Sequence, residues 1–388
     1  MLYDTPEEFA RHNEEVKQVW DAFHKGKPTR VPMTLGISAR TLLLDPKVNT
    51  RGTTFYDYFS NPEVMMEQQL YHAWWVRHNL PFDQEMGLPK DGWGVWVDFQ
   101  NIYEQTYFGC PIHFRDGEVP DVVPILTEDR KNLLFDRGLP DPFRSGLMKR
   151  NWEYYHFFLR KREEGYIYQG RPIVSVSPCG MGTDGPFTAA CGIRGAAEIA
   201  ADIYLAPEFV HKLMAYITDA TIARIQAYRK YLGHDMQTQG WGFADDSIQL
   251  LSVETYKEFV LPYHRKLVNT FSKGGPNSIH LCGDATRHFK TLRDELNIMS
   301  FDTGFPVDFG RLRKELGPKV HISGGVHVTL LRDGTPEAVR QESKRILQSG
   351  IKRGGKFVFR EGNNLAPCTP IENLKAMYAA CKEYGRYR

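Results

Sequence analysis

From about residue 170 onward, short apolar runs alternate with longer amphipathic segments, and this alternation most constrains the fold. It favours parallel strands joined by crossover helices. Earlier apolar runs bring the expected strands to about eight, which predicts one α/β domain over residues 1–388, a (β/α)₈ TIM barrel. An open doubly wound sheet is the alternative, but no Gly-x-Gly-x-x-Gly opens a helix after a first strand. The expected strands are 31–36, 81–86, 172–177, 236–244, 277–282, 297–302, 319–324 and 355–361, and the expected helices are 207–232, 252–271, 336–348 and 370–384.

The segment 88–168 does not fit this repeat. We interpret it as an inserted lid or side wall over the barrel mouth, although its aromatic residues could equally fasten a long excursion to the barrel. Upstream, the run from Thr5 to Glu8 is acidic and predicts a capped helix as an N-terminal extension. The aromatic residues of the segment include Trp93, Trp96, Phe99, Tyr103, Tyr107 and Phe108.

Composition narrows the class of protein. The 388 residues are 41% hydrophobic and 25% charged, which is ordinary globular usage. A formal net charge of +2, with basic residues scattered along the chain, argues against nucleic acid or an anionic membrane as partner. Six cysteines are too sparse for a disulfide scaffold, so a cytoplasmic location is expected, and no stretch approaches the roughly 20 apolar residues of a membrane span.

One motif predicts a metal. His280 and Cys282 lie two residues apart on an expected strand, so their side chains share a face. Cys368 follows the last expected strand, and the next residues predict a capping box with Thr369 as N-cap and Pro370 at N1. The helix N-terminus would favour its thiolate. One imidazole and two thiolates suit a catalytic zinc with an open fourth position, whereas each residue alone is commonly a core residue.

Polar residues at other strand ends are candidates for the same site. Asp245 could be a displaceable fourth zinc ligand or a proton donor, and its alternative role is a helix cap. Trp241 could form a wall for a ring substrate or corrinoid, and core packing is nearly as well supported. The remaining candidates for contact with substrate are Asp83, Asp246, Asp302 and Asn363.

The chain resembles the uroporphyrinogen decarboxylase superfamily from Lys27 to its C-terminal helix, in the stretches 185–188, 251–264 and 362–370. Residues 33–40 lack the Arg-x-x-Gly-Arg-Tyr segment with which the decarboxylase branch grips its substrate. His280, Cys282 and Cys368 instead match the zinc-dependent, corrinoid-linked methyltransferase branch, and some of its members have an acidic residue near the place of Asp245. The resemblance implies the TIM barrel and a small corrinoid protein as partner.

The resemblance implies a methyl-transfer reaction. We expect zinc to bind the oxygen of a methyl ether, such as a methoxylated aromatic, while cobalt of the corrinoid (cobalamin) protein takes the methyl group in an O-demethylation. The alternatives are methyl transfer from the corrinoid to a thiol such as coenzyme M or to a folate, a metal-free decarboxylase or lyase, and a non-catalytic corrinoid-binding module. The sequence is compatible with a homodimer.

Overall fold

The computed structural model describes residues 2–3 and 5–387. Helices and strands alternate along most of this length, which confirms the expected α/β class. None of the helices in the described part is long and apolar enough to cross a membrane. The helices are α1 (Pro6–His24), α2 (Ala39–Leu43), α3 (Phe55–Ser60), α4 (Pro62–Asn79), α5 (Tyr103–Tyr107), α6 (Leu133–Arg137), α7 (Met148–Glu163), α8 (Pro186–Arg194), α9 (Ala196–Leu205), α10 (Pro207–Leu232), α11 (Val253–Phe259), α12 (Leu261–Phe271), α13 (Phe289–Leu296), α14 (Phe309–Leu316), α15 (Val328–Asp333), α16 (Pro336–Gln348) and α17 (Ile371–Tyr384). The strands are β1 (Trp93–Trp96), β2 (Ile112–His113), β3 (Asp121–Val122), β4 (Ile167–Tyr168), β5 (Arg171–Ser177), β6 (Gly242–Ala244), β7 (Asn277–Leu281), β8 (Ile298–Thr303), β9 (His321–His327) and β10 (Phe357–Gly362).

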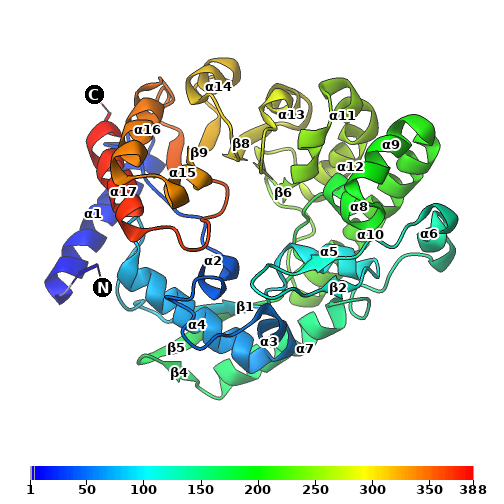
Figure 1. Ribbon diagram of the computed structural model, residues 1–388, viewed down its shortest axis with the longest axis horizontal. Helices are drawn as coiled ribbons and strands as arrows, with labels where there is room; N and C mark the ends of the chain where they lie inside the picture. Colours follow the sequence, from blue (N-terminus) through cyan, green and yellow to red (C-terminus); the bar gives the residue numbers. More distant parts are fainter. Residues whose placement is uncertain (1, 4, 388) are drawn as a thin grey trace.

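The largest sheet is parallel and runs in the order β10-β9-β8-β7-β6. Figure 1 shows α13, α14 and α16 on the outer side of this sheet, as crossover helices of right-handed units would lie. A second sheet pairs β1 with β5 in parallel and β5 with the short β4 in antiparallel fashion. The two sheets curve around one central region in Figure 1.

Strand register brings particular side chains into one row across the large sheet. Ala244 on β6 lies beside His280 on β7, His280 beside Asp302 on β8, and Asp302 beside Ser323 on β9. Because side chains alternate along a strand, the residues next to each of these point to the other face. That other face is packed against the outer helices, as the stacking of Phe301 on Phe289 of α13 illustrates.

The expected early strands are only partly formed. Residues 31–36 have a single bridge, Met33 to Phe359 on β10, flanked by backbone hydrogen bonds that attach this segment to the large sheet. Residues 81–86 are not a strand, and Asp83 N–H donates to the Met33 carbonyl at 2.9 Å. The sequence pattern did not predict the strand β1. This strand pairs with β5 and lies inside the segment expected to be an insertion. The excursion therefore begins after β1.

The aromatic residues of that segment mostly fasten it to the core. Trp93, Phe99, Tyr107 and Phe108 are buried, Tyr103 is partly buried, and Trp96 is half exposed, at 51%. Helices α4 and α7 pack against the sheet of β1 and β5. These aromatic residues therefore supply core packing, and a lid or side wall formed by the segment 88–168 stays a prediction.

Helix boundaries follow local capping chemistry. Thr5 and Glu8 form the expected capping box at the start of α1. The expected helix 252–271 is broken at Val260, between α11 and α12, and Pro262 lies in the first turn of the second helix. Helix α1 lies beside α17 on one side of the molecule (Figure 1), and Lys382 of α17 pairs with Glu15 of α1 at 2.7 Å.

Candidate metal centre

An imidazole, a thiol and a carboxylate meet beyond the C-terminal ends of β6 and β7. They belong to His280, Cys282 and Asp246, and one ligand atom of each lies within 4.8 Å of the others. His280 Nε2 is 3.1 Å from Cys282 Sγ, and Cys282 N–H donates to Asp246 Oδ1 at 2.7 Å. The register that pairs Ala244 with His280 continues past the strand ends and places Asp246 beside Cys282.

The imidazole of His280 is oriented by a carboxylate on the neighbouring strand. Its Nδ1–H donates to Asp302 Oδ2 at 2.7 Å, and Asp302 also accepts from Arg360 Nη1 at 2.7 Å. Burial disfavours the charged imidazolium, but the hydrogen bonds with Asp302 and Cys282 outweigh it and raise the pKa of His280 to about 11. The Nδ1 contact leaves Nε2 as the nitrogen that faces Cys282, which is the usual arrangement of a metal-binding histidine. Asp302 therefore orients the His280 ring in this structure, and its expected contact with substrate stays a prediction.

The loop after β10 reaches the same site. Arg360 Nη2 donates to Glu361 Oε1 and to the Asn363 carbonyl, at 2.7 and 2.9 Å. The side chain of Asn363 accepts from Cys282 Sγ–H at 2.9 Å. Asn363, a predicted site residue, thus lies directly against the thiol. Its φ of 102° is unusual for asparagine and turns the loop at this point.

These three donors fit a transition metal. Zinc binds cysteine sulfur, histidine nitrogen and carboxylate oxygen in a tetrahedral arrangement, and three protein ligands leave one position for a substrate atom. The side chain of His280 is 30% exposed, so the cluster is accessible from solvent. Burial raises the pKa of the Cys282 thiol, and a bound cation would reverse that preference by favouring the thiolate.

Cys368 does not lie in this cluster. Its side chain is exposed, its Sγ lies 3.8 Å from the Leu44 carbonyl, and it lines a separate cavity with Thr41 and Leu374. The capping box predicted beside it is not formed, because α17 begins at Ile371 and the Thr369 hydroxyl donates to the Ala366 carbonyl instead. Cys368 as a zinc ligand stays a prediction that requires the loop 363–370 to move.

Asp245 caps a helix, which is the alternative role expected for it from the sequence. It is fully buried and accepts from the backbone N–H groups of Phe187 and Thr188, at 3.0 and 2.8 Å, where α8 begins. It also accepts from the Thr188 hydroxyl at 2.7 Å and lies 2.8 Å from His264 Nε2. With its oxygens used in this way, Asp245 fastens α8 to β6. Asp246, and not Asp245, is the aspartate grouped with His280 and Cys282 in this structure, so a proton-donating role of Asp245 stays a prediction.

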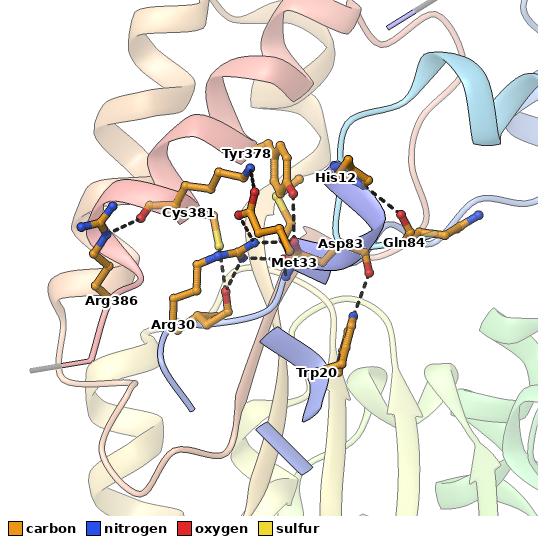
Figure 2. Close-up of polar contacts among 12 residues, drawn as sticks. His12, Trp20, Arg30, Met33, Asp83, Gln84, Tyr378, Cys381 and Arg386 are labelled. Atoms are coloured by element: carbon orange, nitrogen blue, oxygen red, sulfur yellow. Dashed lines mark hydrogen bonds and ion pairs between the residues drawn. The ribbon is translucent and has the colours of Figure 1, made fainter. Parts of the chain in front are cut away.

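Asp83 is a structural anchor. Figure 2 shows its carboxylate between the guanidinium of Arg30 and the hydroxyl of Tyr378. Arg30 binds it through two hydrogen bonds of 2.6 Å, and Met33 N–H adds a third at 2.7 Å. The side chain is 0% exposed, so it offers nothing to a substrate in this conformation. It joins the N-terminal segment to α17.

Trp241 belongs to the core. It is 6% exposed, and its ring stacks on Phe243 at an interplanar angle of 14° and contacts Phe271. It therefore supports β6 from the helix side and does not form a wall of the metal centre. Of the two roles considered for Trp241, core packing is the one that its contacts support.

Sequence reasoning missed a buried polar cluster next to the site. Arg224 and Glu104 are both 0% exposed and pair at 2.6 Å, and Glu104 also accepts from Asp184 N–H at 2.8 Å. Burial, followed by the nearby Glu104 and Asp246 carboxylates, raises the pKa of Asp184 well above its ordinary value. Asp184 directly precedes the Gly185-Pro186 start of α8, but nothing in the sequence joins it to Glu104 or Arg224.

Comparison with known proteins gives the family. The family model for uroporphyrinogen decarboxylase (URO-D) matches residues 166–384, more than half of the chain. A methylated-thiol–coenzyme M methyltransferase of Methanosarcina mazei is 32% identical over 229 residues, which are 58% of this chain and 56% of that protein. A uroporphyrinogen decarboxylase of Geobacter metallireducens is 30% identical over 48% of this chain and 55% of its own length. The match thus spans little more than half the length of these two relatives.

Other similarities extend over more of the chain. A methylcobamide:CoM methyltransferase of Methanosarcina acetivorans is 25% identical over 84% of this chain and 92% of its own length. The solved structure of a methyltransferase from Methanosarcina mazei superposes with a TM-score of 0.63, covers 95% of this chain and 98% of its own, and is 19% identical in sequence, which shows a shared fold. The chain belongs to the uroporphyrinogen decarboxylase family.

Proposed function

We propose that this protein is a methyltransferase that moves a methyl group between a small molecule and a corrinoid carried by a separate protein, with zinc bound at His280 and Cys282. The observation that carries the proposal is the cluster of His280, Cys282 and Asp246, with nitrogen, sulfur and oxygen donors in reach of one ion. The names of two similar proteins, both methyltransferases and one acting with a methylcobamide, support the same reaction class.

A bound zinc would supply a Lewis acid that stabilises negative charge on an oxygen or sulfur of the substrate. The chain's own residues prepare that position. Asp302 fixes the His280 ring, Asn363 holds the Cys282 side chain, and Arg360 ties the loop after β10 to both. Asp246 completes the donor set in the present conformation. Cys368 would be the further thiolate ligand if the loop 366–370 moved toward the cluster, and Asp246 would then be free to exchange a proton with the substrate.

The substrate class separates two forms of the proposal. The first is a methyl ether, such as a methoxylated aromatic, that gives its methyl group to the corrinoid. The second is a small thiol that exchanges a methyl group with the corrinoid, and the thiol and coenzyme M in the names of the two similar methyltransferases favour it. An aromatic-rich wall would suit a methoxylated aromatic, but many of the aromatic residues of 88–168 are buried in the core, so the thiol is the better supported of the two.

The test combines metal analysis with a transfer assay. Purified protein should contain close to one zinc per chain and should transfer methyl from methylcobalamin to a small thiol, or from a methoxyarene to Co(I) cobalamin. Cys282→Ala should lose zinc and activity while circular dichroism stays unchanged. Cys110→Ala, which alters a buried cysteine outside the cluster, is the matched control. Zinc-free protein with lyase activity would instead favour the metal-free decarboxylase, and corrinoid-protein binding without turnover would favour a binding module.

The role of Cys368 has its own test. Cys368→Ser should weaken zinc binding in the presence of a small thiol, when the loop is expected to close, and Asp246→Asn should weaken it in the absence of one. Equal zinc affinity of wild type and Cys368→Ser under both conditions would remove Cys368 from the ligand set.

A further inference from the structure

The Asp246 carboxylate is placed at the metal centre by a short turn. Strand β6 ends at Ala244, and Asp246 begins the 3₁₀ helix that follows. Its Oδ1 accepts from the Cys282 N–H at 2.7 Å. An aspartate side chain is short, so the direction of its carboxylate follows the backbone that carries it. The residues that fix the turn 244–247 therefore decide whether Asp246 reaches Cys282 and His280.

This turn is held on both sides by the segment that leads into α8. Ala244 N–H donates to the Thr183 carbonyl at 3.1 Å, and Ser247 N–H donates to the Thr188 hydroxyl oxygen at 3.0 Å. Between these two contacts lies the fully buried carboxylate of Asp245, which accepts hydrogen bonds from four groups. Three of the four belong to α8, two backbone N–H groups and one hydroxyl. The Asp245 carboxylate thus attaches the turn to its surroundings.

The fourth donor is His264 on α12. Its Nε2 lies 2.8 Å from Asp245 Oδ2, and the side chains of both residues are 0% exposed. Because a carboxylate only accepts, Nε2 carries the hydrogen, and Nδ1 accepts from the Tyr256 hydroxyl at 3.1 Å. Burial raises the pKa of Tyr256 well above its ordinary value, so this hydroxyl keeps its proton. The three side chains therefore form a directional series of hydrogen bonds in the core.

The helix break at Val260 brings Tyr256 and His264 together. The two residues are eight positions apart, which in a continuous helix would separate them by about 12 Å along the axis. Here α11 ends before Val260, α12 begins at Leu261, and the centroids of the two rings are 5.7 Å apart. The change of direction between the two helices thus completes the hydrogen-bond series behind Asp245.

We propose that His264 is a positioning residue of the metal centre. It holds the Asp245 carboxylate from α12 and thereby keeps the turn 244–247 in the conformation that brings Asp246 to the site. The competing role is packing, because the His264 ring also lies edge-on to Phe243, with 4.8 Å between ring centroids. The expected effect on metal affinity rests on the proposed function, and the expected effect on the turn does not.

The first measurement uses the full-length chain without metal. Hydrogen exchange followed by NMR compares the Cys282 amide, which donates to Asp246, with the Ser278 amide of β7, which donates to a backbone carbonyl at 3.0 Å. His264→Phe keeps an aromatic ring but removes the donor, and it should raise the exchange rate of the Cys282 amide relative to that of Ser278 by about tenfold. His264→Gln keeps an N–H group at the same place, so its relative rate should stay within about threefold of wild type.

The second measurement is zinc affinity in the absence of a small thiol, by competition with a chelating dye. His264→Phe should bind zinc about tenfold more weakly than wild type, and His264→Gln should bind it nearly as well as wild type does. Asp83→Asn is the control for lost stability, because it alters a buried carboxylate outside this cluster. It should change neither the zinc affinity nor the relative exchange rate of Cys282.

Two results would overturn the positioning role. One is a folded His264→Phe variant with the relative exchange rate and zinc affinity of wild type. The other is an equal loss in His264→Phe and His264→Gln, which would assign the role to packing. Wild-type protein that binds no zinc would overturn the proposed function instead, and the exchange measurement would still decide the role of His264. If His264→Phe fails to fold, Tyr256→Phe takes its place, because it removes only the hydroxyl that donates to His264: faster relative exchange at Cys282 supports the proposal, and an unchanged rate overturns it.

Discussion

His280 and Asp302 lie side by side on β7 and β8, with Nδ1 of the imidazole 2.7 Å from Oδ2 of the carboxylate. Because the two strands are parallel and in register, the contact is fixed by the sheet itself. A carboxylate at this position determines which imidazole nitrogen remains for a metal and increases its basicity.

Replacing this carboxylate should weaken the metal site without changing the fold. We expect Asp302→Asn to reduce zinc affinity about 10- to 100-fold, because the amide keeps the shape but not the charge that orients the imidazole. Competition with a chelating dye measures the affinity. Asp333→Asn, an exposed aspartate on α15, is the control. Unchanged zinc affinity in Asp302→Asn would contradict the role given to this residue.

The two adjacent aspartates should respond in opposite ways. Asp246→Asn should lower zinc affinity and leave the free energy of unfolding nearly unchanged. Asp245→Asn should lower the free energy of unfolding by about 2 to 4 kcal/mol, because Asp245 accepts hydrogen bonds at the start of α8 while fully buried. Urea unfolding and zinc titration of both variants provide the comparison. A reversed pattern would mean that Asp245 is the residue at the metal.

The anchor of Figure 2 predicts a large loss of stability. Asp83→Asn should lower the free energy of unfolding by about 3 to 5 kcal/mol, because it removes the buried counter-ion of Arg30 and leaves only the partly exposed Glu15. Glu15→Gln is a close control, since Glu15 also pairs with Arg30, at 3.0 Å, but is 42% exposed. Its loss should stay below about 1 kcal/mol. Equal effects of the two substitutions would show that burial does not govern this cluster.

Two buried histidines predict acid sensitivity. Burial lowers the pKa of His72 and of His288 from 6.5 to about 4. Between these values the unfolded chain binds more protons than the folded one, so the free energy of unfolding falls as the pH drops from 6.5 toward 4 and is unaffected by these groups above 6.5. Each ring contributes up to about 1.4 kcal/mol per pH unit in that window.

Urea unfolding at pH 7.5, 6.0 and 5.0 measures this dependence. His72→Phe should show a shallower loss of stability between pH 6.5 and 5.0 than wild type, because one of the two titrating rings is gone. His156→Phe, which replaces an exposed histidine on α7, is the control and should keep the wild-type slope. A slope in His72→Phe equal to that of wild type would mean that His72 has the same pKa in the folded and the unfolded chain.

Local sequence patterns predicted most of the fold, and their failures have particular causes. The apolar runs at 172–177, 277–282 and 297–302 became strands within a residue or two of the expected bounds. The run at 81–86 did not, because Asp83 inside it is committed to Arg30, a partner 53 residues away that no local pattern reveals. The strand at Trp93 was overlooked because its aromatic residues indicated an excursion, although half of them face the core.

The candidate site shows the same division. The spacing of His280 and Cys282 was sufficient to predict that they share a face, since alternation along a strand is a local property. Choosing between Asp245 and Asp246 required the register of β6 against β7, which pairs Ala244 with His280. The position of Cys368 relative to the site depends on the path of a loop that has positive φ at Asn363 and at Cys368 itself. Loop paths are set by tertiary contacts, which a local sequence pattern does not show.

The sequence by itself therefore determined the α/β alternation, the paired donors of His280 and Cys282, and the family, because each is encoded in spacing over a few residues or in motifs. Only the tertiary structure decided that Asp246 stands beside Cys282, that Asp302 holds the imidazole, and that Asp83 and Asp245 are hydrogen-bonded within the core. These depend on strand register and on contacts between residues far apart in the chain, and hydrophobic periodicity does not carry that information.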